Sequence, residues 1–373
     1  MPNLFSKVKN SLKSLYDHEV QGHAQQHLTT LTSLITGMIN TGRSNLGSIS
    51  TGLPQDIDAA SREKHAKRFL EHKNTTYDVH YLPFVEVILK QIILQSNHKV
   101  GIKFVIDGSV VNSGHIALMI SVVKGNQAIP VYWVVKKGKK GHFTTKMHLD
   151  VVQKVVEIIQ NILDQLALTH IPVTLLGDGE FDSVELQTLC RYPLKWDYIF
   201  RTACDTLLYE DDDEFQPKNL GLAPNTPFLF ISGVDFSKKR FQDVNFLYWH
   251  DVKIYKDPLF LVSSFDDPVQ IMDDYKIRFS IERLFKNFKS AGFNLHKNRL
   301  RIIHAIQNLI IVAALAFCIV LNFGLKNKAS PLRKKVQRID KNSLSIFSFA
   351  YQFIRYCMKM DIHFVLNFDF KDT

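Results

Sequence analysis

The N-terminal part of the chain carries hydrophobic residues at helical spacing. They recur every three or four positions, at Leu28, Leu31, Leu34, Ile35, Met38 and Ile39. Gly42 interrupts the pattern, Ser44 or Asn45 can cap a second short helix, and a basic segment follows Pro54. We therefore expect a helical domain over residues 1–98. Two interpretations of it stay open: a small DNA-binding module of the helix-turn-helix kind, or a helical bundle with a solvated charged face.

From residue 99 the pattern changes to short runs rich in β-branched and aromatic residues. Residues 100–107, 115–123 and 128–135 predict three consecutive antiparallel strands. The runs that follow predict, in order, an amphipathic helix at 149–168, a strand at 172–176, a short helix at 183–189 and a strand at 196–201. Residues 99–202 thus form a mixed α/β unit, in the element order of a ribonuclease-H-like core. Periodicity alone establishes only the mixed α/β class.

The alternation stops after residue 202. Residues 203–268 contain strand-like runs at 228–231, 245–249 and 259–262 but no long helical pattern, which predicts a β-rich insertion. Residues 269–325 continue the core, beginning with a long helix over 269–290. Residues 326–373 form a C-terminal helical region, with a basic linker, a final helix over 344–360 that ends the ordered part, and a possible role in dimerisation.

Composition and charge narrow the class of protein. The 373 residues are 46% hydrophobic, enough for a sizeable core, and the net charge of +10 favours a polyanionic partner such as nucleic acid. The four cysteines lack metal-site spacing and are expected to be reduced thiols, as in the cytosol, and the N-terminal residues lack the apolar stretch of a signal peptide. The apolar run Leu309–Leu321 is shorter than the roughly 18–20 residues of a membrane span, so we expect a buried helix.

Two acidic residues stand at the ends of predicted core strands. Asp107 ends the run FVIDGS and Asp178 ends VTLLGDGEF, each followed by glycine. A carboxylate at the end of a strand can reach a cation at the sheet edge, and hard divalent cations prefer oxygen ligands. Asp-Gly is also common in ordinary turns, so the pattern of each acid alone leaves both interpretations open.

A third acid lies in the predicted helix over 269–290. On a helical wheel Tyr275, Arg278, Glu282 and Lys289 fall on one narrow stripe, opposite apolar positions that can pack on a core. A carboxylate flanked by cations suits a metal and phosphate groups. An ordinary solvated helix face has the same composition, and spacing alone does not separate the two.

These motifs together resemble the DDE transposases of the insertion-sequence-4 family. Tyr275-x2-Arg278-x3-Glu282-x6-Lys289 is similar to the YREK signature of that family, and FVIDGS and LLGDGEF resemble its first-acid and second-acid strands. The resemblance extends over about residues 30–360 and implies a ribonuclease-H-like core. It also accounts for the longer interval between Asp178 and Glu282, where the family carries a β-strand insertion.

The resemblance implies a metal-dependent cut-and-paste transposase. Asp107, Asp178 and Glu282 would be the catalytic carboxylates and would hold two Mg²⁺ or Mn²⁺ ions. Double-stranded DNA would be the partner, both at the terminal inverted repeats of the element and at the target. The chain would act as a homodimer in that complex, in the cytoplasm at the nucleoid, in a bacterium and without a membrane. A ribonuclease-H-like nuclease that does not join strands, or a non-catalytic DNA-binding descendant, are the alternatives.

DNA contacts are expected from other residues. Tyr275, Arg278 and Lys289 would bind phosphates beside the cut by the same resemblance, and Arg201, at the end of the last core strand, could also touch DNA. Further positions keep two interpretations each. Glu180 could support Asp178 indirectly, Asp182 is expected to cap the next helix, and Tyr248 or Trp249 could stack on a flipped base, although a core role is favoured. Solvated or phosphate-binding lysines are expected at Lys136, Lys137, Lys139 and Lys140, and a solvated loop at Glu210–Glu214.

Overall fold

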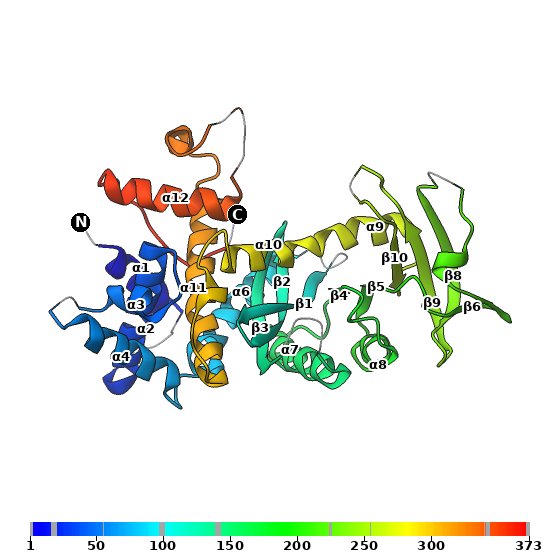
Figure 1. Ribbon diagram of the computed structural model, residues 1–373, viewed down its shortest axis with the longest axis horizontal. Coiled ribbons are helices and arrows are strands. Elements are labelled where there is room, and N and C mark those ends of the chain that lie inside the picture. The colour runs from blue at the N-terminus through cyan, green and yellow to red at the C-terminus, as the bar shows by residue number, and fades with distance from the viewer. Residues whose placement is uncertain are drawn as a thin grey trace.

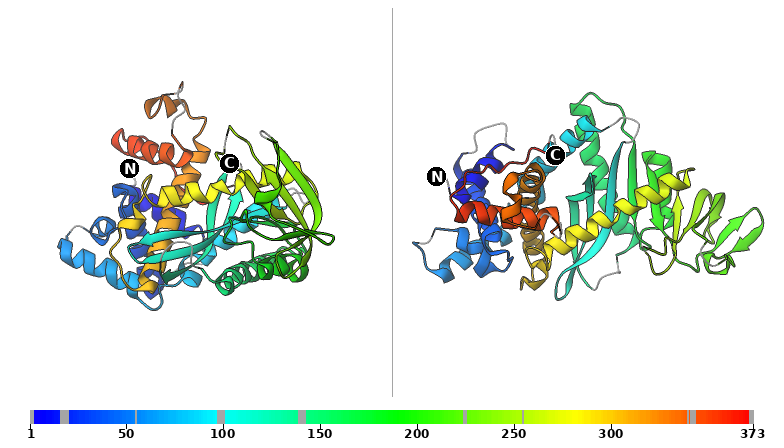
Figure 2. Two further views of the ribbon diagram at one scale, coloured as in Figure 1. Left: turned by 45° about the vertical axis from the view of Figure 1, so that its right-hand side comes forward. Right: turned by 90° about the horizontal axis from the view of Figure 1, so that it is seen from above.

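The computed structural model describes residues 3–15, 21–54, 56–96, 101–138, 143–223, 226–253, 255–338, 340 and 344–370. The molecule is elongated, with N-terminal helices at one end, a mixed sheet in the middle and a β-rich region at the other end (Figure 1). A long helical rod, α9 and α10, runs lengthwise from the β-rich end to the helical end, as the view from above also shows (Figure 2).

The central sheet has the strand order of a ribonuclease-H-like core. Strands β1 (Ile102–Asn112), β2 (His115–Lys124) and β3 (Gln127–Lys137) form an antiparallel meander, and β4 (Val173–Gly177) and β5 (Asp197–Arg201) add in parallel beside β1. The order across the sheet is β3-β2-β1-β4-β5. The crossovers are α7 (Thr145–Gln165) and α8 (Val184–Leu189), the latter continued by a π-helical turn at Cys190–Leu194. The predicted fold class and element order are confirmed.

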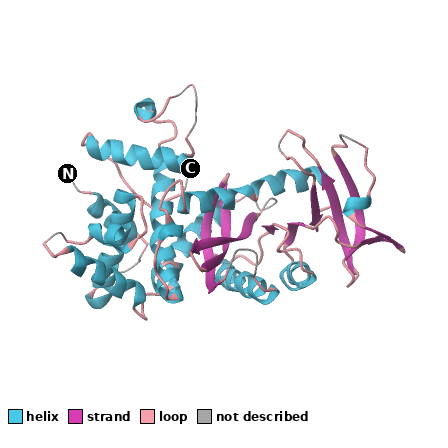
Figure 3. Cartoon of the chain, in the orientation of Figure 1, coloured by secondary structure: helices cyan, strands magenta, loops and turns pink. Residues whose placement is uncertain are grey.

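The β-rich insertion extends this sheet instead of forming a separate one. Its elements are β6 (Leu208–Glu210), β7 (Asp213–Phe215), a 3-10 turn at Pro217–Asn219, β8 (Phe228–Phe236), β9 (Phe241–Trp249) and β10 (Leu259–Ser263). Because β10 pairs antiparallel with β5, core and insertion make one ten-stranded sheet (Figure 3). The acids at Glu210–Glu214 are solvated, as predicted, but they form a tight hairpin and not a loop, because Glu210 of β6 pairs with Asp213 of β7.

The N-terminal region is helical, as predicted. It comprises α1 (Leu4–Lys13), α2 (Gly22–Thr41), α3 (Leu46–Ile49), a 3-10 turn at Ser50–Gly52, α4 (Ala59–Glu71), α5 (Tyr77–His80) and α6 (Leu82–Gln95). Gly42 ends α2 in the left-handed conformation (φ 66°), which glycine adopts without strain, and the Asn45 side chain caps α3 by accepting from Ser48 N.

The C-terminal half is built around a buried apolar helix. After α9 (Pro268–Ile277), α10 (Phe279–Phe288) and a 3-10 turn at Leu295–Lys297 comes α11 (Ile303–Lys326), followed by a 3-10 turn at Pro331–Lys335 and α12 (Ile346–Lys359). Among the described residues α11 is the one helix long and apolar enough to span a membrane, and 94% of its apolar window is buried in the fold. The expectation of a buried helix is confirmed.

The chain does not lose its order after the last helix, contrary to the sequence prediction. Residues 361–370 run back in an extended form and bury every second side chain, namely Phe364, Leu366, Phe368 and Phe370. Phe368 packs on Phe84 of α6, and Ser11 Oγ donates to the Leu366 carbonyl at 2.6 Å. The sequence does contain the signal for this extended segment, because apolar residues alternate with other residues along the tail.

Candidate active site

Parallel pairing of β1 and β4 brings the first two acids together. Ile106 pairs with Gly177, so Asp107 and Asp178 each directly follow a paired residue and stand at corresponding positions of the two segments. Asp107 is 3% exposed, and its Oδ1 accepts from Gly108 N at 2.6 Å. Asp178 is partly exposed, and its Oδ1 accepts from Glu180 N at 3.0 Å. The prediction that Asp107 ends its strand is wrong, because β1 continues to Asn112 and Asp107 pairs with Met119 in mid-strand, whereas Asp178 directly follows β4. Two carboxylates from distant parts of the chain therefore stand on adjacent inner segments of the sheet.

An ion pair fixes the helical rod on the Asp107 face of β1. Lys103 donates to the Asp274 carboxylate of α9, and alternation along the strand puts Lys103 and Asp107 on the same face. The rod crosses the strands instead of running along β1, because α9 contacts β5 whereas α10 contacts β1 and β3. The ion pair therefore holds the rod, with Glu282 on α10, over the face of the sheet that carries Asp107.

Arg278 connects the third acid to the first. Its Nη2 donates to Glu282 Oε1 at 2.5 Å, and the Arg278 side chain is 7% exposed while that of Glu282 is 51% exposed. Burial acts most strongly and lowers the pKa of Arg278, but Tyr275, Glu282 and Asp107 together outweigh it and raise this pKa. Arg278 thus lies in the field of both carboxylates and stays charged.

The single polar stripe predicted along this helix is wrong in two ways. Arg278 interrupts the rod between α9 and α10, where its N–H bonds to the Tyr275 carbonyl three residues back, and Lys289 lies after α10 with non-helical angles (φ −96°, ψ −114°). Tyr275 is 1% exposed and Arg278 6%, so they face the core and not solvent. The wheel assumed one uninterrupted helix, and tertiary packing overrode it.

Lys289 and Arg201 each lie near a segment that carries one of the first two acids. Lys289 lines a small cavity with Ser109, which is two residues along β1 from Asp107. Arg201 is exposed at the end of β5, whose residue Phe200 pairs with Gly177 just before Asp178. Burial raises the pKa of Tyr275 to about 12, with Asp178 adding to the rise and the Arg278 and Arg201 cations opposing it. Arg201, Arg278 and Asp178 therefore act electrostatically on the same buried residue.

Glu180 supports the loop that carries Asp178. Its Oε1 accepts from Phe143 N at 2.9 Å and lies 3.6 Å from Nε2 of His148, which is 2% exposed. Burial works against the charged form of Glu180, but the contacts with His148, Phe143 N and Lys136 outweigh it and lower its pKa. Glu180 thereby ties the start of α7 to the Asp178 loop.

The helix cap predicted at Asp182 is wrong. Ser183 caps α8 by accepting from Leu186 N, and Asp182 accepts from Thr202 Oγ1 at 2.6 Å instead. Ser183, directly after Asp182, is an equally good capping residue by its type. The roles of Lys103, Asp274 and His148 were also missed, because no local sequence signal marks a side chain whose partner is far along the chain.

The aromatic residues of the insertion pack internally. Trp249 is 5% exposed and contacts Tyr255 at 5.1 Å between ring centroids, and Tyr248 contacts Phe260 at 5.9 Å, in keeping with the favoured core role. In the basic loop, Lys136 lies 4.9 Å from the Phe143 ring and Lys137 is exposed. Lys139 and Lys140 lie outside the described residues.

The donor chemistry at this site fits divalent cations. Asp107, Asp178 and Glu282 offer carboxylate oxygens only, the ligand type that Mg²⁺ and Mn²⁺ prefer. Within the described part of the chain, no three His, Cys, Asp or Glu side chains stand close enough together to hold a metal ion. The structure brings together Asp107 and Asp178, whereas the Glu282 side chain is directed to Arg278.

Residues 145–319 match the family model described as Transposase DDE domain, a range that includes Asp178 and Glu282 and begins after Asp107. This match supports a DDE transposase. No curated protein sequence matches the chain.

One similar solved structure is Marinitoga piezophila Argonaute in complex with 5′ OH guide RNA and target DNA. Its sequence identity is 10% and its TM-score 0.24, over 64% of this chain and 34% of the Argonaute chain. The chain thus spans about a third of the length of that protein. A TM-score this low does not establish a shared fold, which here is given by the strand order.

Proposed function

We propose that this protein is a transposase of the insertion-sequence-4 type that cuts an element out of DNA and joins it to a target. The observation that carries the proposal is the placing of the acids. Asp107 and Asp178 each directly follow a paired residue of two adjacent parallel strands, and Glu282 is on the helical rod that Lys103 and Asp274 hold over the same face of β1. The match to the transposase DDE domain supports the same function.

In this proposal Asp107, Asp178 and Glu282 hold two Mg²⁺ or Mn²⁺ ions. When bound, these ions would activate the attacking water or 3′-hydroxyl and stabilise the leaving oxygen of an in-line displacement. The protein itself holds the carboxylates in position. β-pairing fixes Asp107 and Asp178, the Lys103–Asp274 pair fixes the α9–α10 rod, and Glu180 fixes the Asp178 loop.

Two of the basic residues around the acids would bind DNA phosphates. Arg201 is exposed beside Asp178, and Lys289 lies along β1 from Asp107. Arg278 donates to Glu282 and is 6% exposed, so in this proposal it orients Glu282 and does not contact a phosphate directly. Tyr275, whose ring lies 5.6 Å from the Arg278 guanidinium, would hold that guanidinium in place and not contact DNA directly.

The partners follow from this reaction. We propose duplex DNA at the terminal inverted repeats and at the target, a homodimer on paired ends, and a cytoplasmic, nucleoid-associated protein of bacterial origin. The regional assignments of residues 1–98 to DNA binding and 326–373 to dimerisation belong to the same proposal.

The test uses labelled duplexes that carry the DNA flanking the reading frame, with Mg²⁺ and a target plasmid. The wild-type chain should cut the ends and produce joined molecules. Asp107→Asn, Asp178→Asn and Glu282→Gln should each reduce cutting below detection while DNA binding in EDTA persists. The matched control is Asp273→Asn, which removes an exposed carboxylate from the same helical rod.

Three other results would refute parts of the proposal. Cutting without joined products would identify a nuclease. Binding without any metal-dependent cutting by the wild type would identify a non-catalytic DNA-binding protein. Full activity of Glu282→Gln with loss in Asp107→Asn would remove Glu282 from the catalytic set.

A further inference from the structure

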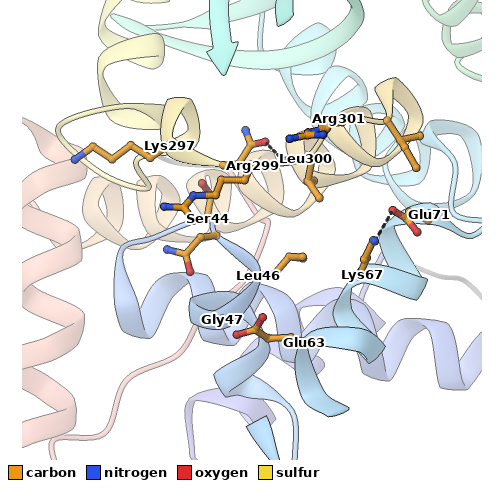
Figure 4. A pocket seen from close by; sticks show the side chains of 13 residues that line it. Ser44, Leu46, Gly47, Glu63, Lys67, Glu71, Lys297, Arg299, Leu300 and Arg301 are labelled. Atoms are coloured by element: carbon orange, nitrogen blue, oxygen red, sulfur yellow. Dashed lines mark hydrogen bonds and ion pairs between the residues drawn. The ribbon is translucent and has the colours of Figure 1, made fainter. Parts of the chain in front are cut away.

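A pocket lies away from the three acids, between the N-terminal helices and the segment that leads into α11. One wall is formed by residues 297–302, and the opposite wall by Ser44–Gly47 with Glu63, Lys67 and Glu71 of α4. Its volume is about 810 Å³. Figure 4 shows Lys297, Arg299 and Arg301 on the first wall and the α4 side chains across from them.

The first wall presents three cations, one at the end of a 3-10 turn and two on the extended backbone that follows it. Lys297, Arg299 and Arg301 are exposed, whereas the residues between them, Asn298 and Leu300, are buried. Lys297 ends the turn, and from Asn298 the backbone is extended, so Arg299 and Arg301 point the same way at a spacing of about 6.6 Å. All three side chains line the pocket, and together they form a short row of charges on its wall.

Buried hydrogen bonds hold this row rigidly against β1. Asn298 Nδ2 donates to the Val111 carbonyl at 2.9 Å, and Asn112 Nδ2 donates to Asn298 Oδ1 at 3.0 Å and to the Leu300 carbonyl at 2.9 Å. The row is thus anchored to the strand that carries Asp107. A preorganised wall loses little conformational entropy when a ligand binds.

The three cations have no anion of their own. Within the ranges that the structure describes, the side chains of Lys297, Arg299 and Arg301 make no ion pair or hydrogen bond. Of the two carboxylates on the opposite wall, Glu71 is already paired with Lys67 at 3.8 Å. With four cations and two carboxylates, the pocket has a net positive charge. Its chemistry fits a polyanion rather than a small neutral ligand.

We propose that this pocket binds the sugar–phosphate backbone of duplex DNA, independently of base sequence. The inference rests on the proposed function, which makes DNA the substrate. Arg299 and Arg301 suit phosphate because each guanidinium can donate two parallel N–H bonds, and Lys297 adds a point charge. Since Lys67 on the facing wall belongs to α4, a duplex held here contacts the N-terminal domain and the catalytic core at once.

The experiment measures binding of a labelled duplex of arbitrary sequence, by fluorescence anisotropy, in EDTA and at several salt concentrations. The variant Lys297→Gln/Arg299→Gln/Arg301→Gln is compared with Lys328→Gln/Lys334→Gln/Lys335→Gln. The second set removes the same charge from exposed residues near the other end of α11, about 36 Å away along the helix.

We expect the pocket variant to bind on the order of 100-fold more weakly at 0.15 M salt, with a salt slope reduced by about 2.7, since each lost phosphate contact removes about 0.9. The control variant should stay within about threefold of the wild type, and Arg299→Lys/Arg301→Lys should retain most of the affinity because it keeps the charge. As a measurement without any variant, added duplex should protect Lys297 but not Lys328 from acetylation.

Equal losses in the two triple variants, or no loss in the pocket variant, would overturn the inference. Because no metal-dependent cutting occurs in EDTA, this assay measures DNA binding alone. A result that refutes the pocket as a DNA-binding site can therefore be told apart from a result that refutes the proposed catalysis. A wild type that binds duplex but does not cut it refutes only the chemistry. A wild type that binds no duplex refutes both.

Discussion

The Lys103–Asp274 ion pair is the contact by which the third-acid helix is held over β1. The two side chains are 17% and 8% exposed. Asp274 Oδ2 is buried and has no hydrogen-bond partner among the described residues, so the carboxylate depends on Lys103 alone. If the pair acts as a clamp, removal of either partner should affect both stability and the position of Glu282.

The size of each loss in the free energy of unfolding depends on which of the two charges remains in the variant. Lys103→Met leaves the Asp274 carboxylate buried and unpaired, which should lower the free energy of unfolding by about 3–5 kcal/mol. Asp274→Leu leaves the ammonium group of Lys103, which can extend to water, so we expect a smaller loss of about 1–3 kcal/mol. The double variant Lys103→Met/Asp274→Leu replaces the pair by apolar groups and should be nearly neutral.

Urea unfolding followed by tryptophan fluorescence measures these differences, since Trp196 stacks on Phe104 of β1 at 6.1 Å. The coupling between Lys103 and Asp274 should be at least about 2 kcal/mol. Cleavage assayed where all variants are folded should fall in both single variants. Additive losses, with a coupling below about 0.5 kcal/mol, would show that the pair does not clamp the helix.

Three further predictions concern other parts of the molecule. Burial lowers the pKa of His80 from 6.5 to about 4, so as the pH falls His80 is protonated in the unfolded chain before it is protonated in the folded one. The free energy of unfolding of the wild type should therefore fall by about 3 kcal/mol from pH 6.5 to pH 4. The free energy of unfolding of His80→Phe should lack this decrease. Glu180→Gln weakens the support of Asp178 and should reduce cleavage or raise the Mg²⁺ requirement about 10–100-fold, read from Mg²⁺ titrations of cleavage. Gly37→Ala places a Cβ 2.1 Å from the Ile49 carbonyl oxygen and should cost about 1–3 kcal/mol in thermal unfolding.

Each of these three has a result that contradicts it. The same pH dependence in His80→Phe and wild type would mean that His80 is not held neutral by burial. Unchanged Mg²⁺ titrations in Glu180→Gln would remove that residue from the site. For Gly37 the control is Gly179→Ala, whose Cβ would meet nothing closer than 3.8 Å, and equal effects of the two would exclude a close-packing role.

Local pattern was sufficient for most of the secondary structure. The strands around Asp107 and Asp178 and the helix around Leu309 were predicted because each is a long run with one clear periodicity. Short or charged elements were not: the hairpin at Glu210–Glu214 is held by cross-strand pairing with β8, which no local pattern reports.

The sequence by itself determined the types of element, the acids within or directly after two core strands, and the resemblance carried by Tyr275, Arg278, Glu282 and Lys289. These are properties of residues close together in the sequence, because periodicity and motif spacing act within single elements. Only the tertiary structure decided that Asp107 and Asp178 stand at corresponding positions of adjacent segments, that Tyr275 and Arg278 are buried, and that residues 297–301 face α4. Strand register and long-range ion pairs join residues far apart in the chain, and their free energy exists only once the chain has folded.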